Sequence, residues 1–392
     1  MAEKKKILFI VEAMGGGVFT YIVDLANELV IEYDMYIAYA VRKQTPENYR
    51  DYFDKRVNLI KVKIFERSID LIKDLKAFFE IKRIAREAQP DIINLHSSKA
   101  GALGRFAFDG KSVPLFYTPH GYSFLMKNHS ALKRLIYRKV ETVCGKRNCT
   151  TISCSEGEHQ ETLKLTKNAA YVSNGININE LQKMMDSVGK IKEHSFTVFT
   201  LGRICYQKNP KLFNEIAMAL PDVKFMGIGD GELRDELTAP NIEITGWVER
   251  ELALRHSMNG DVFLLTSLWE GLPISLLEAM CMKKLCVVSD VIGNRDVIHN
   301  DINGYVCHNA DEFVRTIKSL QGKNISGLIE KAYSDILIQY NITVMANKYS
   351  EIYTNKITAR NSQWGVRHEL IFYAVFFESV ANVRSFREAV AA

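Results

Sequence analysis

Two glutamates, Glu270 and Glu278, lie on either side of a predicted helix start and could bind or act on a polar ligand. They follow a short apolar run, Val262–Leu265, that predicts a buried strand. Pro273 falls at or near the first turn of the helix expected over Ile274–Met282. A helix start offers unpaired N–H groups and a positive dipole end, which suit a phosphate or the polar edge of a sugar. Taken alone, the pattern favours an ordinary helix start with an acidic first turn, and only features elsewhere in the chain change that interpretation.

Two cations, Arg203 and Lys208, follow the strand predicted at Thr197–Leu201. Gly202 and Arg203 come directly after the strand, and Lys208 stands near a helix start. Arg and Lys separated by a short loop at a strand's carboxyl end can grip a diphosphate. No Asp-x-Asp motif occurs, so the sequence offers no carboxylate pair suited to holding Mg or Mn on a diphosphate. Charge neutralisation is therefore expected from the two cations and helix dipoles, with no metal and no other cofactor.

Two glycine-rich turns follow other predicted strands. Gly15–Gly17 precedes a helix, where glycines let backbone N–H groups approach a bound anion. The G-x-G-x-x-G dinucleotide pattern is absent, and a simple tight turn explains this stretch equally well. The run Phe225–Gly231 ends a second strand and leads to a short helix predicted at Glu232–Leu237, which could border a nucleobase.

Two histidines end neighbouring predicted strands. His120 follows the strand at Leu115–Thr118, and His96 follows the strand at Asp91–Leu95. Ligands of doubly wound sheets collect at the carboxyl ends of the strands. The pair therefore favours a polar ligand site, with His120 as the better candidate, although a lone histidine is more often structural.

The elements that must position these residues alternate between short apolar runs and amphipathic helices. This alternation predicts an α/β fold of two doubly wound, Rossmann-like domains with parallel sheets. The expected strands are Ile7–Val11, Met35–Ala40, Val57–Lys61, Asp91–Leu95, Leu115–Thr118, Thr151–Cys154, Ala169–Val172, Thr197–Leu201, Val223–Gly227, Ile242–Thr245, Val262–Leu265 and Leu285–Val288. The expected helices include Phe19–Val30, Leu71–Glu87, Lys99–Phe108, Leu132–Val143 and Glu156–Leu165. The Ser173–Asn177 turn and the polar stretch Asp186–His194 form the expected linker.

The composition is that of a globular chain with ample core. Its 392 residues, 47% hydrophobic and 10% aromatic, suit two domains or at most three. The seven cysteines include no Cys-x-x-Cys pair, and no signal peptide is recognised, so reduced thiols in a cytosol are expected. The first apolar run is too short for a signal segment or a membrane span.

Positive charge is concentrated in the first half of the chain. Residues 1–190 carry a net +8 and residues 191–392 carry −3, and residues 101–150 alone carry +7. Within Leu125–Cys149, apolar residues near helical spacing accompany seven cations and one acid. A basic amphipathic helix often lies on an anionic membrane, and a solvated surface helix is an equally good interpretation. Nucleic acid is not expected, because no helix-turn-helix, zinc-finger or RNP signature occurs.

The order of these motifs resembles the retaining glycosyltransferases with the two-domain GT-B fold that are known as family 4. The similarity covers about residues 5 to 358, and the combination is more specific than any single motif. The motifs that carry it are Gly15-Gly16-Gly17, His120-Gly121, Ser173-Asn-Gly-Ile-Asn177, Gly202-Arg203 with Lys208, Gly227-Ile-Gly229-Asp-Gly231, and Glu270 with Glu278. The segment His120–Phe124 is similar to bacterial members that build capsule, O-antigen or exopolysaccharide.

The resemblance implies a role for each of these residues in a cleft between two domains. Arg203 and Lys208 would bind the donor diphosphate and stabilise the leaving group. Glu270 and His120 would contact the donor sugar, and Glu278 the ribose of the nucleotide. The other donor-binding residues implied are Gly16, Gly17, Gly202, Gly229, Gly271, Leu272 and Pro273. Such enzymes need no metal.

The implied activity is a hexosyl or N-acetylhexosaminyl transferase, with a UDP-sugar as the favoured donor. The acceptor would be a polyprenyl-linked saccharide at the inner face of a bacterial membrane, where the chain would bind peripherally through Leu125–Cys149. A covalent intermediate would need a carboxylate about 5 Å from its partner, and none can be assigned. Same-face transfer is therefore expected, with the leaving phosphate helping to deprotonate the acceptor hydroxyl. A nucleotide-sugar epimerase of the same fold and a catalytically silent partner subunit remain open, while an NAD enzyme is disfavoured.

Three segments follow from this interpretation, and two features depart from it. The segments are an acceptor-binding domain at residues 1–177, a nucleotide-sugar-binding domain at 178–358 and a helical extension at 359–392. Where the family has Gly-Gly, two residues and Glu, this chain has Ile292-Gly-Asn-Arg-Asp296. The chain also continues past the helix expected near Met345–Ile357 into a tail with an apolar run, Leu370–Phe377. Packing on the body is favoured for the tail, with a dimer or membrane contact as alternatives.

Overall fold

The computed structural model describes residues 3–42, 44–63, 65, 70–188, 195–320 and 322–360. Two parallel sheets with helices packed around them lie within one compact unit, Met1–Lys348. Residues 342–360 are helical, close to the prediction at Met345–Ile357. The predicted extension at 359–392, apart from its first two residues, lies outside the described residues.

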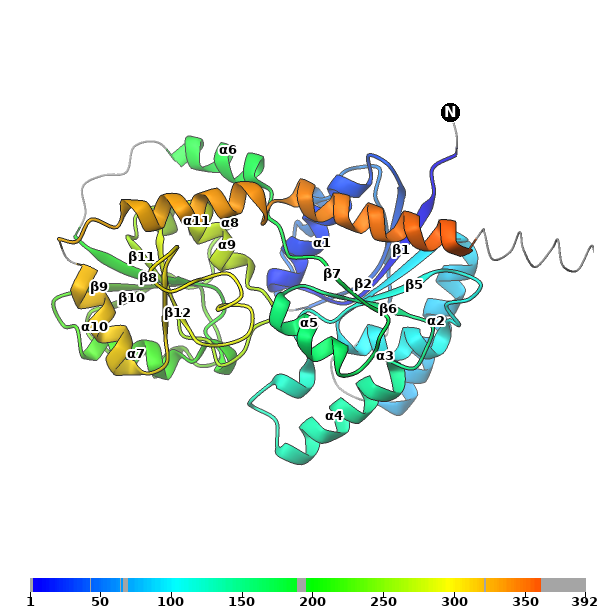
Figure 1. The fold of residues 1–392 in the computed structure, drawn as a ribbon, viewed down its shortest axis with the longest axis horizontal. Coiled ribbons are helices and arrows are strands. Elements are labelled where there is room, and N and C mark those ends of the chain that lie inside the picture. The colour runs from blue at the N-terminus through cyan, green and yellow to red at the C-terminus, as the bar shows by residue number, and fades with distance from the viewer. Residues whose placement is uncertain are drawn as a thin grey trace, which may run out of the picture. The chain divides into compact units, whose positions relative to one another are not determined.

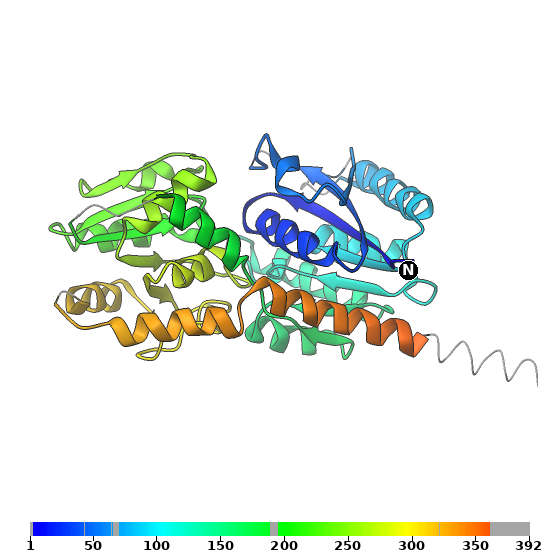
Figure 2. The same ribbon diagram turned by 90° about the horizontal axis from the view of Figure 1, so that it is seen from above.

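The first half of the chain forms a seven-stranded sheet in the order β3-β2-β1-β4-β5-β6-β7. Its strands are β1 (Lys6–Met14), β2 (Asp34–Val41), β3 (Asn58–Lys61), β4 (Ile92–His96), β5 (Leu115–Thr118), β6 (Thr150–Ser153) and β7 (Ala169–Tyr171). Its helices are α1 (Gly16–Leu29), α2 (Leu71–Ala88), α3 (Ser98–Ala107), α4 (Ala131–Cys144) and α5 (Glu156–Leu163), with 3-10 turns η1 (Tyr49–Tyr52) and η2 (Ser123–Leu125). Helices cover both faces of the sheet (Figure 1, Figure 2), which explains why the central strands β1 and β4 are buried along their length.

The second half forms a six-stranded sheet in the order β10-β9-β8-β11-β12-β13. Its strands are β8 (Thr197–Leu201), β9 (Lys224–Ile228), β10 (Ile242–Ile244), β11 (Val262–Leu265), β12 (Leu285–Ser289) and β13 (Tyr305–Cys307). Its helices are α6 (Ile178–Val188), α7 (Pro210–Met218), α8 (Arg250–Met258), α9 (Ile274–Cys281), α10 (Ala310–Leu320) and α11 (Ser326–Ile338), with 3-10 turns η3 (Tyr206–Lys208) and η4 (Arg234–Glu236). The predicted fold of two doubly wound, parallel α/β domains is confirmed, whereas the domain boundary at residue 177 stays a prediction.

Each sheet has one point where the strand order reverses. In the first sheet it lies between β1 and β4, and in the second between β8 and β11. Polar loops that leave the carboxyl ends at such a point are the usual ligand sites of doubly wound sheets. Four of the predicted motifs leave these strands or the neighbouring β5, so the topology gathers them at two edges.

Some elements differ from the predictions. The edge strand β13 was not predicted, because three residues between turns carry too little periodicity. The short helix expected at Glu232–Leu237 is reduced to the 3-10 turn η4. The side chain of Asn214 accepts hydrogen bonds from the amides of Thr238 and Ala239 (both 2.8 Å), which turns the chain away from a longer helix.

The linker expected at Ser173–Asn177 and Asp186–His194 stays a prediction, and residues 189–194 of it lie outside the described residues. Ile176 bridges Asn341, its N–H donates to the Tyr340 carbonyl, and a β-carbon at Gly175 would lie 2.3 Å from the Asn341 carbonyl oxygen. The Ser173–Asn177 turn is therefore tightly packed. The helix α6 follows it at once and includes the start of the polar stretch that was expected to be a linker.

All seven cysteines are buried free thiols. Burial raises the pKa of Cys281 to about 12 and that of Cys307 to about 11. Among the described residues, no helix combines the length and the hydrophobicity needed to cross a bilayer.

Candidate active site

Glu270 and Lys208, predicted on separate grounds, form an ion pair at the carboxyl edge of the second sheet. The Lys208 Nζ lies 2.7 Å from the Glu270 Oε1, and the Glu270 residue is only 7% exposed. The Ser267 hydroxyl donates to the same carboxylate oxygen at 2.6 Å, and the Gln207 amide donates to the other at 3.1 Å. Both oxygens of the carboxylate thus accept hydrogen bonds, and a ligand reaching Lys208 also meets Glu270.

Hydrogen bonds between the loop after β11 and the loop after β8 bring this pair together. After β11 ends, the Thr266 hydroxyl donates to the Lys208 carbonyl at 2.7 Å. The Leu268 N–H donates to the Gln207 carbonyl at 2.8 Å, and the Gln207 side chain donates to the Trp269 carbonyl at 3.0 Å. These bonds fix the turn that carries Glu270 against the turn that carries Lys208. The contributions of Ser267 and Gln207 were missed, because neighbouring polar residues in a sequence do not reveal which of them point inward.

Arg203 lies half-buried after β8, and within the described residues no carboxylate forms an ion pair with it. The backbone around it requires glycine. Gly202 has φ 137° and Gly229 has φ 132°, a region that other residues rarely adopt. A β-carbon at Gly229 would lie 2.2 Å from the Gly202 carbonyl oxygen. The glycines therefore let the ends of β8 and β9 touch directly before Arg203.

The turn after Glu270 meets the turn after β5 backbone to backbone. A β-carbon on Gly271 would lie 2.9 Å from the Gly121 nitrogen, and one on Gly293 would lie 2.2 Å from the Gly271 oxygen. The Leu272 carbonyl accepts a hydrogen bond from the Asn174 amide at 2.8 Å. Pro273 caps α9 with φ −75° and ψ 123°, as its predicted place at the helix start requires.

His120 lies in this contact region with a φ of 57°. Its Nε2 is 3.1 Å from the Nδ1 of His96, so one ring donates to the other. Desolvation by burial lowers the pKa of His120 to about 3 and that of His96 well below its usual value. The lowered pKa values favour neutral rings, and of the two only His120 is partly exposed, so it is His120 that suits hydrogen bonding to a neutral sugar hydroxyl.

Glu158, which sequence reasoning missed, holds the His120 turn in place. Its two carboxylate oxygens accept from the Gly121 and Cys154 amides at 2.7 and 2.8 Å. Burial raises the pKa of this carboxyl. Its place in the first turn of α5 looked like an ordinary acidic helix start, so no sequence signal separated it from Glu156.

The glycine loop before α1 lies close to α9. A β-carbon on Gly17 would lie 3.9 Å from the Ile274 Cγ1, whereas one on Gly16 would meet nothing within 4 Å. The first turn of α1, which includes Gly16 and Gly17, therefore lies next to the start of α9, with open space at the Gly16 β-carbon position. This placement suits the predicted approach of a phosphate or an acceptor to the loop.

Glu278 is buried on α9 and forms an ion pair with Arg250, the first residue of α8. The Arg250 Nη2 lies 2.8 Å from the Glu278 Oε1. Asp24 of α1 faces the same pair, and burial raises the pKa of Asp24 to about 7. Sequence reasoning missed Arg250 and Asp24, since they belong to elements far from Glu278 along the chain.

Asp296, at the position where the chain departs from the resembled pattern, bonds to backbone. One of its carboxylate oxygens accepts from the Gly293 amide at 3.0 Å and from the Gly157 amide at 2.9 Å. These amides belong to the turn after β12 and to the first turn of α5. Asp296 therefore links the two halves of the unit.

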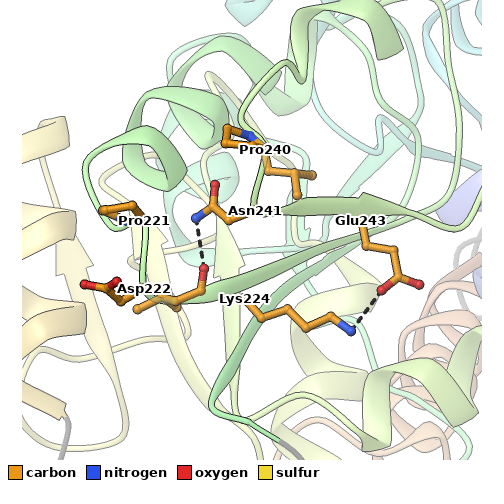
Figure 3. Close-up of a pocket in the computed structure, with 8 residues that line it drawn as sticks. Pro221, Asp222, Lys224, Pro240, Asn241 and Glu243 are labelled. Atoms are coloured by element: carbon orange, nitrogen blue, oxygen red, sulfur yellow. Dashed lines mark hydrogen bonds and ion pairs between the residues drawn. The ribbon is translucent and has the colours of Figure 1, made fainter.

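A surface depression of about 410 Å³ lies at the other end of the second sheet (Figure 3). It is lined by residues around the amino ends of β9 and β10, including an ion pair of 2.9 Å between Lys224 and Glu243. None of the predicted site residues lines it. Within the part of the chain that the structure describes, no three His, Cys, Asp or Glu side chains gather closely enough to hold a metal ion.

Family comparisons match both halves of the chain. A model described as Glycosyltransferase Family 4 matches residues 15–180, and one described as Glycosyl transferases group 1 matches residues 195–322. Each match contains one of the two sheets almost completely, and together they contain every predicted site residue.

Curated relatives are similar over most of their length. The Escherichia coli UDP-Gal:alpha-D-GlcNAc-diphosphoundecaprenol alpha-1,3-galactosyltransferase is 29% identical over 78% of this chain and 86% of its own. The Campylobacter jejuni N,N'-diacetylbacillosaminyl-diphospho-undecaprenol alpha-1,3-N-acetylgalactosaminyltransferase is 24% identical over 76% of this chain and 86% of its own.

Solved structures share the fold at lower identity. The Anabaena protein HepE, in complex with UDP and glucose, covers 90% of this chain and all of its own with a TM-score of 0.70 and 16% identity. Sucrose-phosphate synthase from Thermosynechococcus elongatus covers 91% of this chain and all of its own with a TM-score of 0.76 and 13% identity. With its two matched halves and this fold, the chain belongs to the GT-B glycosyltransferases, and it joins a family 4 domain to a group 1 glycosyl transferase domain.

Proposed function

We propose that the chain is a retaining, metal-independent transferase that moves a hexose or N-acetylhexosamine from a UDP-sugar to a polyprenyl-diphosphate-linked saccharide. The half up to residue 177 is proposed to bind the acceptor, and the half from 178 to 358 the donor. The observation that carries the proposal is the Lys208–Glu270 ion pair at the end of the second sheet, next to the Gly202 backbone that leads into Arg203. The names of the two relatives above, which print undecaprenol diphosphate acceptors, support the choice of acceptor.

The charges at this edge suit a diphosphate leaving group. Arg203 can form two parallel hydrogen bonds to phosphate oxygens, and Lys208 adds a point charge. The start of α9 contributes the positive end of its dipole. Because these groups are held in place before the reaction, they can stabilise the charge that develops as the anomeric bond breaks.

The engaged carboxylates favour same-face transfer over a covalent intermediate. Both oxygens of Glu270 accept hydrogen bonds, and Glu278 is paired with Arg250. In the proposed step the acceptor oxygen bonds to the anomeric carbon as its bond to the diphosphate oxygen breaks, and the acceptor proton passes to the diphosphate. The alpha linkage printed in both relatives' names fits retention from an alpha-linked donor.

The mechanism predicts that no sugar becomes attached to the protein. Intact-protein mass spectrometry after incubation with a 2-fluoro UDP-sugar should detect only the unmodified mass. A stable adduct that maps to Glu270 or Glu278 would show that one of them is a nucleophile and would refute same-face transfer.

The donor site predicts selective, metal-independent stabilisation by UDP. In thermal unfolding with UDP, GDP, dTDP and ADP, UDP should give the largest rise in melting temperature, and EDTA should not change it. A ligand at a hundred times its Kd adds roughly 2.7 kcal/mol, which is readily measured. Arg203→Ala should lose the shift, whereas Arg255→Ala, in an exposed ion pair on α8, should keep it.

Turnover then separates the remaining alternatives. Sugar transfer to a synthetic polyprenyl-diphosphate N-acetylhexosamine supports the proposal. Release of UDP with an epimerised sugar in the absence of acceptor would instead identify an epimerase. If no nucleotide shifts the melting temperature, a silent partner subunit becomes the better interpretation.

The acceptor implies contact with a membrane, and α4 is the proposed contact. Its side chains Leu132, Leu135 and Ile136 are 68, 51 and 51% exposed, although apolar side chains of a surface helix normally face the core. A peripheral position at the cytoplasmic face of the bacterial membrane is proposed on this ground, because a basic amphipathic helix binds an anionic surface.

A further inference from the structure

Glu278 has a cationic partner that the resemblance did not include. Arg250 is the first residue of α8 and lies 28 positions before Glu278 in the sequence, yet their side chains are 2.8 Å apart. The Glu278 side chain is 6% exposed and the Arg250 side chain 30%. Buried charged groups are usually paired, and Arg250 is the partner of Glu278.

The position of Arg250 is costly for the helix that carries it. A cation at the first position of a helix lies at the positive end of the helix dipole, where acids are favoured. Glu249 and Glu251 surround it in sequence, but the ion pair is made across to α9. The proximity of Glu278 is the largest cause that raises the pKa of Arg250 above its ordinary value. The guanidinium is therefore held by α9 rather than by its own helix.

A third element shares this pair. Asp24 of α1 faces Arg250, Glu278 and Glu180, and it also accepts a hydrogen bond from the Asn177 backbone. One guanidinium thus faces three carboxyl groups. Desolvation favours a proton on Asp24, which leaves the charge of Arg250 to Glu278.

We propose that Arg250 is a positioning residue for donor binding. Its planar guanidinium holds the Glu278 carboxylate in place by the 2.8 Å ion pair, so that the remaining lone pairs of the carboxylate can accept hydrogen bonds from the hydroxyls of the nucleotide. The inference rests on the proposed function, because it takes Glu278 to contact the nucleotide.

The test is a thermodynamic cycle of UDP affinity, measured by calorimetry on the full chain. The variants are Arg250→Ala, Arg250→Lys, Glu278→Gln and the double variant Arg250→Ala with Glu278→Gln. Arg250→Ala should weaken UDP roughly 10-fold to 100-fold, as expected when a buried charged group loses its partner. Arg250→Lys should recover part of the loss. In the double variant, the Arg250 change should cost nothing beyond Glu278→Gln, because the two residues act as one unit.

A kinetic readout separates positioning from a general structural role. The KM for the donor should rise in Arg250→Ala while kcat changes little, because the contact is made equally before and during transfer. The matched control is Arg255→Ala, on the same helix and in an exposed pair with Glu251, which should leave KM unchanged. If Arg250→Ala does not fold, Arg250→Gln can replace it, because glutamine keeps much of the side-chain length. The KM for the donor should rise in that variant too.

Three results would overturn the inference. One is unchanged or tighter UDP binding by Arg250→Ala. A second is an undiminished effect of Arg250→Ala in the Glu278→Gln background, which would mean that Arg250 contacts the nucleotide directly. The third is the absence of UDP binding by the unmodified chain. That result would refute the proposed function as well, and it is distinguishable because it is measured before any substitution is made.

Discussion

The four buried carboxyl groups around the site illustrate different ways to accommodate a charge away from water. Glu270 has Lys208, and Glu278 has Arg250. Glu158 accepts two backbone amide hydrogen bonds. Asp24 instead faces Arg250 together with Glu278 and Glu180, and burial raises its pKa to about 7. Among these groups, the pKa of Asp24 places its change of protonation near neutral pH.

Asp24 predicts a pH dependence of stability. Its pKa is about 7 in the native state and 3.8 in the reference state, so between pH 4 and 7 the folded chain binds a proton that the unfolded chain does not. The stabilisation is complete below pH 4 and is lost as the pH rises through 7, by at most about 4 kcal/mol. Asp24→Asn mimics the protonated acid. Its free energy of unfolding should exceed that of the unmodified chain by only about 1.7 kcal/mol at pH 5 and by about 4 kcal/mol at pH 8.

Urea unfolding at the two pH values measures this difference. The control is Asp222→Asn, which removes an exposed acid and should leave the pH dependence unchanged. Equal pH dependence in Asp24→Asn and the unmodified chain would show that Arg250 keeps Asp24 ionised in spite of burial.

Sequence reasoning at this scale found residues but not their partners. Arg203, Lys208 and Glu270 could be predicted because strand ends and a helix start mark positions where ligands bind. The pairing of Glu278 with Arg250, and the bonds of Ser267 to Glu270, depend on which side chains face inward after folding. No local pattern encodes that choice.

The helix α4 exposes an unusual combination of cations and apolar side chains. Its one acid, Glu141, is buried and accepts hydrogen bonds from the Arg105 guanidinium at 2.7 Å and the Tyr117 hydroxyl at 3.0 Å. The outward charges of the helix are therefore all positive. They lie beside exposed apolar side chains, at Leu132, Leu135, Ile136, Val140 and Val143. Figure 1 shows α4 at the margin of the first half, outside the helices that pack on its sheet.

This surface predicts binding to anionic vesicles. Lys133→Glu with Lys139→Glu should weaken binding to vesicles of phosphatidylglycerol and phosphatidylcholine roughly 10-fold or more, because each cation near such a surface contributes about 1 kcal/mol. Co-sedimentation measures the bound fraction. A double variant in the second half, Lys211→Glu with Lys318→Glu, makes the same change of net charge at exposed helical positions and should bind as before.

Two results would contradict a membrane role for α4. Equal losses in both double variants would mean that net charge alone drives binding. No binding by the unmodified chain would leave the apolar face of α4 unexplained by a membrane.

The elements that could be predicted are those with strong periodicity. The bounds of β5, β8 and β11 agree with the prediction, because each is a buried apolar run between polar turns. The short β13 and the single turn η4 could not be predicted, since their conformation is imposed by neighbours.

For the whole molecule, the alternation of strands and helices was enough to predict two doubly wound sheets. Parallel sheets require helical crossovers, and the crossovers leave few possible strand orders. The contact between the halves was harder to predict from the sequence. It depends on Gly121 and Gly271, whose missing side chains allow the two backbones to meet. It also depends on Asp296, whose carboxylate accepts hydrogen bonds from amides of both halves. Only the departure from the resembled motif drew attention to Asp296.

The seven buried thiols have a practical consequence. A thiol reacts as its thiolate, and burial here both hides the sulfurs and raises the pKa of several of them, including Cys281 and Cys307. Maleimide and spin labels should therefore modify the unaltered chain slowly. A single cysteine introduced on the surface of each half would then take up a label selectively, without prior removal of the native ones. Spectroscopic distances between the halves, with and without nucleotide, become accessible in a chain whose core is untouched.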